Sequence, residues 1–168
     1  TVAVFDNLLA CSVNYNESPN RTPRPFDAGR DGLVVGEGGG AVILEEYQAA
    51  KKRGAVILGE IIGFACNNNG GDLILPNLDG ITATLRLALQ DAGISAGDVD
   101  FVSAHATATK MGDVIEAQAI GAVYGNKPLV TGLKSYMGHT MGTCGVIESI
   151  LALYMMEQGF IAPTLNLE

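Results

Sequence analysis

The feature of this chain that most constrains its fold is the alternation of β-rich runs with helical patterns. The β-rich runs lie at residues 32–46, 55–66, 99–106 and 127–133, and residues 66–72 (CNNNGGD) form a polar loop. The helical patterns lie at residues 45–53, 79–92, 113–124 and 143–158. Strands that alternate with helices favour a sheet that is covered by helices. The sequence therefore predicts an α/β fold built in layers.

Several residues mark where the predicted helices begin and end. Gly54 and Gly93 follow the first two helical patterns, where glycine is the usual stop residue. Asp79 is in position to cap the second helix. Asp113, followed by Glu116, resembles the start of a capping box for the third helix. We therefore expect these two helices to begin at the two aspartates.

Composition and charge argue against several classes of protein. The chain has 168 residues, of which 48% are hydrophobic and 17% charged, as expected of a packed globular protein. Its net charge of −8 argues against a general nucleic-acid binder, which needs basic residues to meet phosphates. No apolar run reaches the roughly 18–20 residues of a membrane span, and no signal peptide is visible. The three cysteines form no disulfide framework, so we expect a reducing compartment, the cytoplasm.

Both ends of the chain look interrupted. The first residues, TVAVFDNLLACS, are already apolar and contain no Met, and the last residues, PTLNLE, read as the middle of an element. We expect the chain to be a piece of a larger protein.

A glycine cluster at residues 36–41 (GEGGGA) has two interpretations. Its spacing, Gly36-x-Gly38-x-x-Ala41, matches a dinucleotide-binding motif. Such a site needs a helix directly after the glycines, whereas the next residues, AVILEE, have the composition of a strand. A glycine-rich hairpin or a backbone crossing is the simpler interpretation.

Two loops carry the only histidines of the chain. His105 follows a predicted strand, and Thr107 and Thr109 alternate after it, so both hydroxyls can face an amide-bearing ligand. Lys134 and His139 lie five residues apart in the second loop, after another predicted strand. If these strands are neighbours, the two loops converge. Two histidines without a third nearby ligand argue against zinc. The alternatives are a backbone-bonded histidine, turn-capping threonines and a surface lysine.

Glu148 lies within the apolar run GVIESILALYMM. If the helix is buried, the carboxylate needs a charged or hydrogen-bonding partner, for which Lys134 is the natural candidate. The alternative is a solvated stripe along the helix, and for Lys134 a solvent-facing position that serves docking.

Together, these segments resemble the β-ketoacyl-acyl-carrier-protein synthases. Residues 104–120 (AHATATKMGDVIEAQAI) are similar to the family's histidine loop, usually His-Gly-Thr-x-Thr-x-x-Gly-Asp with a Glu three residues on. Residues 133–149 (LKSYMGHTMGTCGVIES) are similar to its second signature, Lys-x-x-x-Gly-His-x-x-Gly-x-x-Gly followed by Glu. Residues 24–46 and 160–168 also match in order and spacing. The resemblance covers nearly the whole chain and is strongest to the bacterial elongating synthases of fatty acid biosynthesis.

The resemblance implies a fold and a reaction. The fold is a thiolase-like αβαβα layered sandwich, of which residues 1–54 close the first half and residues 55–168 supply most of the second. A cysteine takes an acyl chain from acyl carrier protein; malonyl carrier protein then loses carbon dioxide, and its carbanion attacks the acyl thioester. Thr107 and Thr109 would bind the phosphopantetheine arm, which arrives on the carrier, so no separate cofactor and no metal is expected. A cytoplasmic homodimer with no nucleic-acid or membrane partner is implied.

The resemblance also implies roles for the charged and imidazole groups. His105 and His139 would lie over the malonyl group, where donors stabilise the enolate-like charge as it develops. Lys134 would hold the second histidine loop and supply positive charge, acting through Glu148.

Three departures from the family pattern stand out. The family's nucleophile precedes its Arg-Asp-Gly stretch, and none of Cys11, Cys66 and Cys144 matches it, so this piece alone is expected to be inactive. Cys144 stands where the family usually has alanine and is interpreted as a small packing residue. Ala106 replaces the usual glycine after the first histidine, which would shift the backbone of that loop.

Other functions stay open at this point. A ketosynthase of polyketide assembly, a non-catalytic chain-length-factor subunit and a scaffold or interaction fragment are compatible with the same segments. The residues that precede this stretch in the whole protein would separate them.

Overall fold

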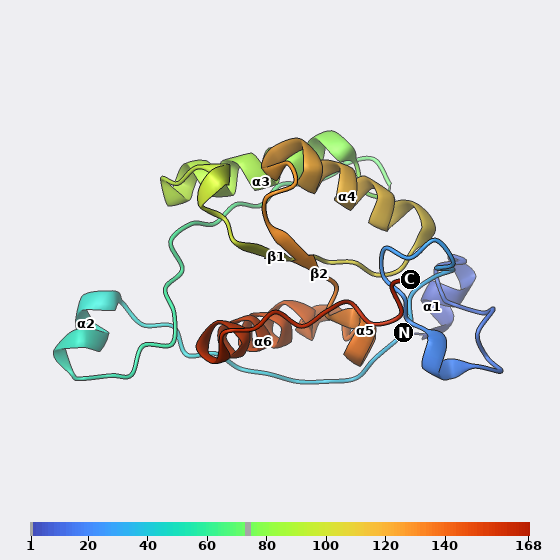
Figure 1. The fold of residues 1–168 in the computed structure, drawn as a ribbon, viewed down its shortest axis with the longest axis horizontal. Helices are drawn as coiled ribbons and strands as arrows, with labels where there is room; N and C mark the ends of the chain where they lie inside the picture. Colours follow the sequence, from blue (N-terminus) through green and yellow to red (C-terminus); the bar gives the residue numbers. More distant parts are fainter. Residues whose placement is uncertain (1, 73–74) are drawn as a thin grey trace.

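The computed structural model describes residues 2–72 and 75–168, and a pair of parallel strands lies at its centre (Figure 1). Strand β1 (Phe101–Ser103) pairs with β2 (Leu129–Thr131), with Val102 opposite Val130. The α-helices are α1 (Val2–Asn7), α2 (Tyr47–Lys52), α3 (Leu78–Ala92), α4 (Lys110–Tyr124), α5 (Lys134–Met137) and α6 (Cys144–Gln158). Short 3-10 helices are η1 (Pro19–Arg21), η2 (Ala96–Asp98) and η3 (Met141–Thr143).

The helices cover the strand pair from two sides. Figure 1 shows α3 and α4 next to each other on one side of β1 and β2, with α5 and α6 on the other. A small core of Ala104, Ala106 and Ile120 packs against partly buried Phe26, Leu85, Val102 and Tyr124. The predicted α/β layering is confirmed, and the four predicted helices are present as α2, α3, α4 and α6. The division into halves at residues 54 and 55 stays a prediction, and Thr1 lies outside the described residues.

Two predicted strands are wrong as regular elements. Residues 32–46 make only isolated bridges, Cys11 to Leu33 and Val35 to His139, and residues 55–66 are extended without a ladder partner among the described residues. Their apolar side chains are largely exposed, for example Ile43 at 93% and Val56 at 87%. A strand is defined by its hydrogen-bonded neighbour, so apolar β-rich composition without a neighbour gives only extended chain.

The start of α3 differs from the prediction by its cap. The side chain of Asn77, not that of Asp79, accepts the cap hydrogen bond from the backbone N–H of Gly80 at 3.0 Å. Asp79 lies in the first turn instead, where its charge favours the positive end of the helix dipole. Gly93 ends the helix in the left-handed conformation at φ 66°, as predicted.

The start of α4 also differs. The helix begins at Lys110, one turn before the predicted Asp113, and Thr109 is its N-cap residue. The carboxylates of Asp113 and Glu116 do not form a capping box for this helix; they turn back to bind loop backbone, as described below. No helix in the described ranges is long and apolar enough to cross a membrane.

Candidate active site

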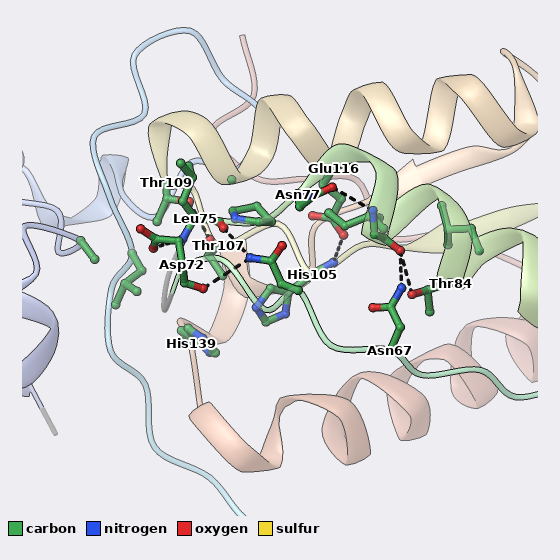
Figure 2. Close-up of a pocket in the computed structure, with 18 of the residues that line it drawn as sticks. Asn67, Asp72, Leu75, Asn77, Thr84, His105, Thr107, Thr109, Glu116 and His139 are labelled. Carbon is green, nitrogen blue, oxygen red and sulfur yellow. Dashed lines mark hydrogen bonds between the residues drawn. The ribbon is translucent and has the colours of Figure 1, made fainter.

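Both histidines face one cavity of about 570 Å³ (Figure 2). Polar residues of its wall are Asn67, Asn69, Asp72, Asn77, Thr84, Thr107, Thr109 and Glu116. Apolar residues of its wall are Phe5, Leu33, Leu75, Ile81 and Leu85. Most of the wall's surface area is apolar although many of its residues are polar, and apolar surface with convergent polar groups is typical of a small-molecule site.

The two histidine loops converge because the strands that precede them are parallel neighbours. The ring centroids of His105 and His139 lie 5.2 Å apart with an interplanar angle of 86°. Figure 2 shows the two side chains close together, His105 from the loop after β1 and His139 from the loop after α5. The conditional prediction that these loops meet is confirmed.

Two carboxylates of α4 hold the loop that carries His105. Glu116 accepts hydrogen bonds from the backbone N–H groups of His105 and Ala106, both at 2.7 Å. Asp113 accepts from the N–H of Ala108 at 3.0 Å and from that of Phe26 at 2.7 Å. Ala106 and Ala108 have φ angles of 40° and 64°, a region costly for residues with a Cβ. The carboxylates therefore fix a strained loop in which Ala106 and Ala108 both have left-handed backbone, and the effect of alanine in place of glycine at position 106 stays a prediction.

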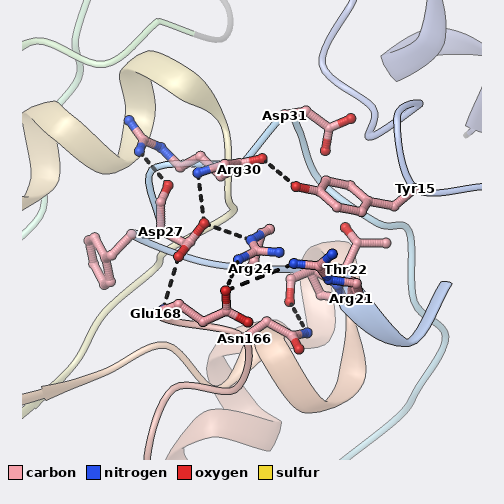
Figure 3. Close-up of polar contacts among 12 residues, drawn as sticks. Tyr15, Arg21, Thr22, Arg24, Asp27, Arg30, Asp31, Asn166 and Glu168 are labelled. Atoms are coloured by element: carbon pink, nitrogen blue, oxygen red, sulfur yellow. Dashed lines mark hydrogen bonds and ion pairs between the residues drawn. The ribbon is translucent and has the colours of Figure 1, made fainter. Parts of the chain in front are cut away.

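An arginine-rich segment braces the end of the same loop (Figure 3). Arg30 donates to the carbonyl oxygens of Thr109 at 3.2 Å and Lys110 at 2.6 Å. It also donates to the carbonyl of Asp27 at 2.8 Å, and the Asp27 side chain accepts from Arg24 at 2.7 Å. The segment that contains these charged residues thereby ties the histidine loop to the N-terminal part of the chain.

The loop that carries His139 is fixed by a backbone crossing with the glycine cluster. The N–H of His139 donates to the carbonyl of Val34 at 2.7 Å, and the N–H of Gly36 donates to the carbonyl of His139 at 3.0 Å. A Cβ on Gly36 would lie 2.2 Å from the carbonyl oxygen of Met137. The backbone-crossing interpretation is confirmed. The dinucleotide interpretation is wrong, because the next helix, α2, begins only at Tyr47.

The ring of His139 is held on its Nδ1 side. Nδ1 lies 3.0 Å from Sγ of Cys144 and 3.3 Å from the backbone N–H of Met141. Cys144 is 4% exposed, as expected of a packing residue, but its contact with the histidine was not predicted.

Lys134 and Glu148 form a buried ion pair beneath the histidines. Lys134 Nζ donates to Oε1 of Glu148 at 2.6 Å, and the exposed fractions of the two side chains are 1% and 12%. The predicted pairing is confirmed, whereas the solvent-facing lysine and the solvated helix stripe are wrong. The pair joins the start of α5 to α6, on either side of the His139 loop.

Burial and the lysine charge favour the neutral form of both imidazoles, because both lower the pKa of each ring. His105 opens onto the cavity, yet surrounding protein disfavours its charged form, and together with Lys134 and His139 this lowers its pKa to about 4. The pKa of His139 is lowered by burial and by Lys134. Each neutral ring carries one N–H donor and one acceptor nitrogen.

The two threonines of the first loop lie together at the wall. Their Oγ1 atoms are 3.1 Å apart, and both residues line the cavity, so the predicted projection of Thr107 and Thr109 to one side is confirmed. Within residues 2–72 and 75–168, no three His, Cys, Asp or Glu side chains gather as a metal site.

Sequence reasoning missed part of the wall. The amides of Asn67, Asn69 and Asn77 line the cavity, as does Phe5 of α1, whose ring centroid lies 6.4 Å from that of His139. Three consecutive asparagines in the 66–72 loop are the signal that could have marked this segment as more than a connection.

Two family profiles match the chain. The profile described as Beta-ketoacyl synthase, N-terminal domain matches residues 2–50, and Beta-ketoacyl synthase, C-terminal domain matches residues 58–168. The chain is 40% identical over 165 residues to 3-oxoacyl-[acyl-carrier-protein] synthase 1 of Escherichia coli (strain K12), covering 98% of this chain and 40% of that protein. It is 41% identical over 169 residues to 3-oxoacyl-[acyl-carrier-protein] synthase 2 of Mycobacterium bovis, covering 99% and 40%. The chain thus spans about two fifths of the length of these relatives.

Solved structures show the same arrangement. A β-ketoacyl synthase from Burkholderia phymatum STM815 superposes with a TM-score of 0.93 at 46% identity, covering 99% of this chain and 41% of that one. A type II PKS ketosynthase in complex with its acyl-carrier protein (AntDE:AntF) superposes with a TM-score of 0.94 at 34% identity, covering 99% and 42%. The fold is therefore that of part of a thiolase-like ketosynthase.

Proposed function

Because the chain belongs to the β-ketoacyl synthase family, we propose that the protein containing it is a 3-oxoacyl-[acyl-carrier-protein] synthase of fatty acid biosynthesis. The observation that carries this proposal is the pair of neutral imidazoles, 5.2 Å apart, in a cavity with a polar and an apolar wall. The catalysed reaction is the decarboxylative Claisen condensation of an acyl-enzyme with malonyl-acyl carrier protein.

The chemistry needs donors rather than a strong base. The bond between C2 of the malonyl group and its carboxylate breaks, carbon dioxide leaves, and the electron pair spreads onto the thioester oxygen as an enolate. One N–H from each of His105 and His139 would bind that oxygen, where a preorganised donor is worth most. C2 then attacks the acyl thioester carbon, and the enzyme's sulfur leaves as thiolate. The lowered pKa of both rings supports this role. A neutral imidazole donates a hydrogen bond to the thioester oxygen but does not form an ion pair with the malonyl carboxylate, which must leave as carbon dioxide.

The acyl-carrying cysteine is proposed to come from another part of the protein. Among the described residues that line the cavity there is no cysteine. Cys144 lies behind the ring of His139, and Cys66 is exposed. The chain of 168 residues would then supply the malonyl side of the site and be inactive by itself.

Lys134 is proposed to act through position and charge. Its ammonium is held by Glu148 and points away from bulk water, so it raises the positive potential beneath both rings. That potential favours the developing enolate and disfavours protonation of the imidazoles.

Acyl carrier protein is the proposed partner. The paired hydroxyls of Thr107 and Thr109 at the cavity wall suit the amides of a phosphopantetheine arm. A structural neighbour is a ketosynthase bound to its acyl-carrier protein. No other cofactor is needed for the reaction. We further propose a cytoplasmic homodimer, in which the rest of the protein covers the exposed apolar runs at 42–44 and 56–64.

A polyketide ketosynthase is the second candidate. The specific observation for it is the likeness to the AntDE:AntF ketosynthase at 34% identity and to the ishigamide ketosynthase/chain length factor at 38%. The identity of 40–41% to 3-oxoacyl-[acyl-carrier-protein] synthases favours the first proposal.

Condensation by the purified full-length protein tests both candidates. The protein is incubated with acyl- and malonyl-acyl carrier protein, and the carrier-bound products are identified by mass spectrometry. A single 3-oxoacyl product per turnover supports the 3-oxoacyl-[acyl-carrier-protein] synthase. Repeated condensation without reduction supports the polyketide ketosynthase. Absence of any condensed product would contradict both and leave the non-catalytic subunit.

A further inference from the structure

We propose that Cys144 is a positioning residue that holds the ring of His139 in the tautomer with its proton on Nε2. The thiol and the ring nitrogen Nδ1 are 3.0 Å apart; His139 lines the cavity, whereas Cys144 is 4% exposed and is not part of the wall. The effect on rate rests on the proposed condensation, whereas the tautomer itself does not.

The backbone favours one direction of the hydrogen bond. The N–H of Met141 points at the same Nδ1 at 3.3 Å, and a backbone N–H can only donate. This long bond favours a lone pair on Nδ1 without fixing it alone, and the shorter contact with the thiol of Cys144 adds a second donor to the same lone pair. In a neutral ring the single proton is then on Nε2.

A third buried group supports the thiol in this direction. The hydroxyl of Thr140 donates to Sγ of Cys144 at 3.4 Å, and the two residues are 6% and 4% exposed. A relay from hydroxyl to thiol to imidazole results, in which each donor strengthens the next. The sulfur accepts one bond and gives one, as a thiol can.

The charged groups around His139 act in the same sense. Lys134 and the ring of His105 face it from α5 and from the loop after β1, and Glu148 is engaged by Lys134. No carboxylate contacts Nδ1 among the described residues. A carboxylate at that position would accept a proton from Nδ1 and would stabilise the imidazolium form. A thiol donor at Nδ1 stabilises the opposite form, the neutral ring with Nε2–H.

The consequence for the reaction is one of orientation. No protein group engages Nε2 in the part of the chain that the structure describes, so this N–H is available to the thioester oxygen. With the proton on Nδ1, a lone pair would face that oxygen and repel the enolate. Cys144 thereby raises the fraction of enzyme in the competent tautomer.

Nuclear magnetic resonance of the full-length protein tests the assignment without turnover. The histidines are labelled with ¹⁵N, and the ring nitrogen shifts of His139 are recorded in the wild type and in Cys144→Ala, Cys144→Ser and Cys66→Ala. We expect an Nε2-protonated ring in the wild type and in Cys66→Ala, which removes an exposed thiol. Cys144→Ala should move the Nδ1 signal and mix the tautomers, and Cys144→Ser, which keeps a donor, should restore the wild-type pattern. Wild-type shifts in Cys144→Ala, or an Nδ1 proton in the wild type, would overturn the proposal.

Kinetics supply the second readout. In Cys144→Ala the kcat of malonyl decarboxylation should fall roughly three- to tenfold, the effect of one net hydrogen bond, with KM little changed. Cys144→Ser should recover most of it, and Cys144→Ala should add nothing in a His139→Ala background. An additive loss in that background would overturn the positioning role. If the wild-type protein releases no carbon dioxide from malonyl-acyl carrier protein, the proposed function is refuted. The tautomer assignment is then still tested by the ring nitrogen shifts.

Discussion

Substituting either member of the Lys134–Glu148 ion pair should destabilise the protein far more than substituting a member of an exposed ion pair with the same N–O distance. The ammonium and the carboxylate are 2.6 Å apart, with 1% and 12% of their side chains exposed. Lys134→Met leaves a carboxylate in an apolar helix surface, and Glu148→Gln leaves an ammonium without its counter-charge. Removing one member of a buried pair costs about 3–5 kcal/mol, because the other charge stays buried. We expect Glu148→Gln near the lower end, because the amide oxygen still accepts a hydrogen bond.

The double variant measures the interaction itself. Lys134→Met with Glu148→Gln should cost less than the sum of the single changes by about 1–3 kcal/mol, the coupling typical of contacting residues. The measurement is urea unfolding of the full-length protein, followed by circular dichroism for the four members of the cycle. Arg53→Ala is the control, because Arg53 and Glu45 also approach to 2.6 Å but are 61% and 30% exposed. That control should leave the unfolding midpoint almost unchanged.

Two results would refute this reasoning. Additive single effects would mean that the two side chains do not interact in solution. A Lys134→Met change within about 0.5 kcal/mol of the wild type would mean that the lysine behaves as a surface residue.

Three further predictions concern the surroundings of the site. Gly36→Ala should lower the unfolding free energy by about 1–3 kcal/mol, because the added Cβ would lie 2.2 Å from a backbone carbonyl oxygen. Gly39→Ala is the control, because nothing lies close to its added Cβ, and it should not destabilise the protein. Thermal unfolding compares the two variants, and equal midpoints would contradict the backbone crossing at Gly36. The pKa of Asp27 is lowered to about 2, chiefly by Arg24, so its stabilising effect is present above the ordinary value of 3.8 and is lost as pH falls toward 2. Asp27→Asn should therefore lower the unfolding free energy by about 2 kcal/mol at pH 7 and hardly at pH 2, and a pH-independent difference would contradict this. For His105, the folded pKa of about 4 lies below the ordinary 6.5, so the unfolded state binds an extra proton between these values and stability falls as pH drops from 6.5 to 4. His105→Gln should flatten that fall in urea titrations, and an unchanged slope would argue against a depressed pKa.

The convergence of the two histidine loops could be predicted because it depends on local order along the chain. Each loop follows a short β-rich run, and two such runs paired as parallel neighbours bring their ends to one edge. The Lys134–Glu148 pair could be predicted for a related reason: each charge lies within a few residues of the same glycine-rich loop, and buried charges need partners.

Features that depend on distant segments could not be predicted. Asp113 and Glu116 carry a capping-box spacing, yet their carboxylates bind the backbone of His105, Ala108 and Phe26, contacts that exist only once the loops are folded together. The extended runs at 32–46 and 55–66 have strand composition, but composition does not supply the neighbouring strand that a ladder requires.

The contact of Cys144 with His139 was hidden for a third reason. The cysteine lies five residues after the histidine, where a small apolar side chain fills helix packing equally well. The 3-10 turn η3 lies between the two residues, and the contact of Sγ with Nδ1 depends on it. Sequence spacing alone does not predict that turn.

The most direct test of the central claim separates decarboxylation from acyl transfer in the full-length protein. Release of carbon dioxide from malonyl-acyl carrier protein is measured for the wild type, His105→Ala and His139→Ala, and loading of an acyl chain onto the enzyme is followed by intact-protein mass spectrometry. We expect each alanine variant to lose decarboxylation by a factor on the order of 10²–10³, the loss on removal of one preorganised donor, while still accepting the acyl chain. Decarboxylation at the wild-type rate in either variant would contradict the claim that the two imidazoles act together on the malonyl thioester.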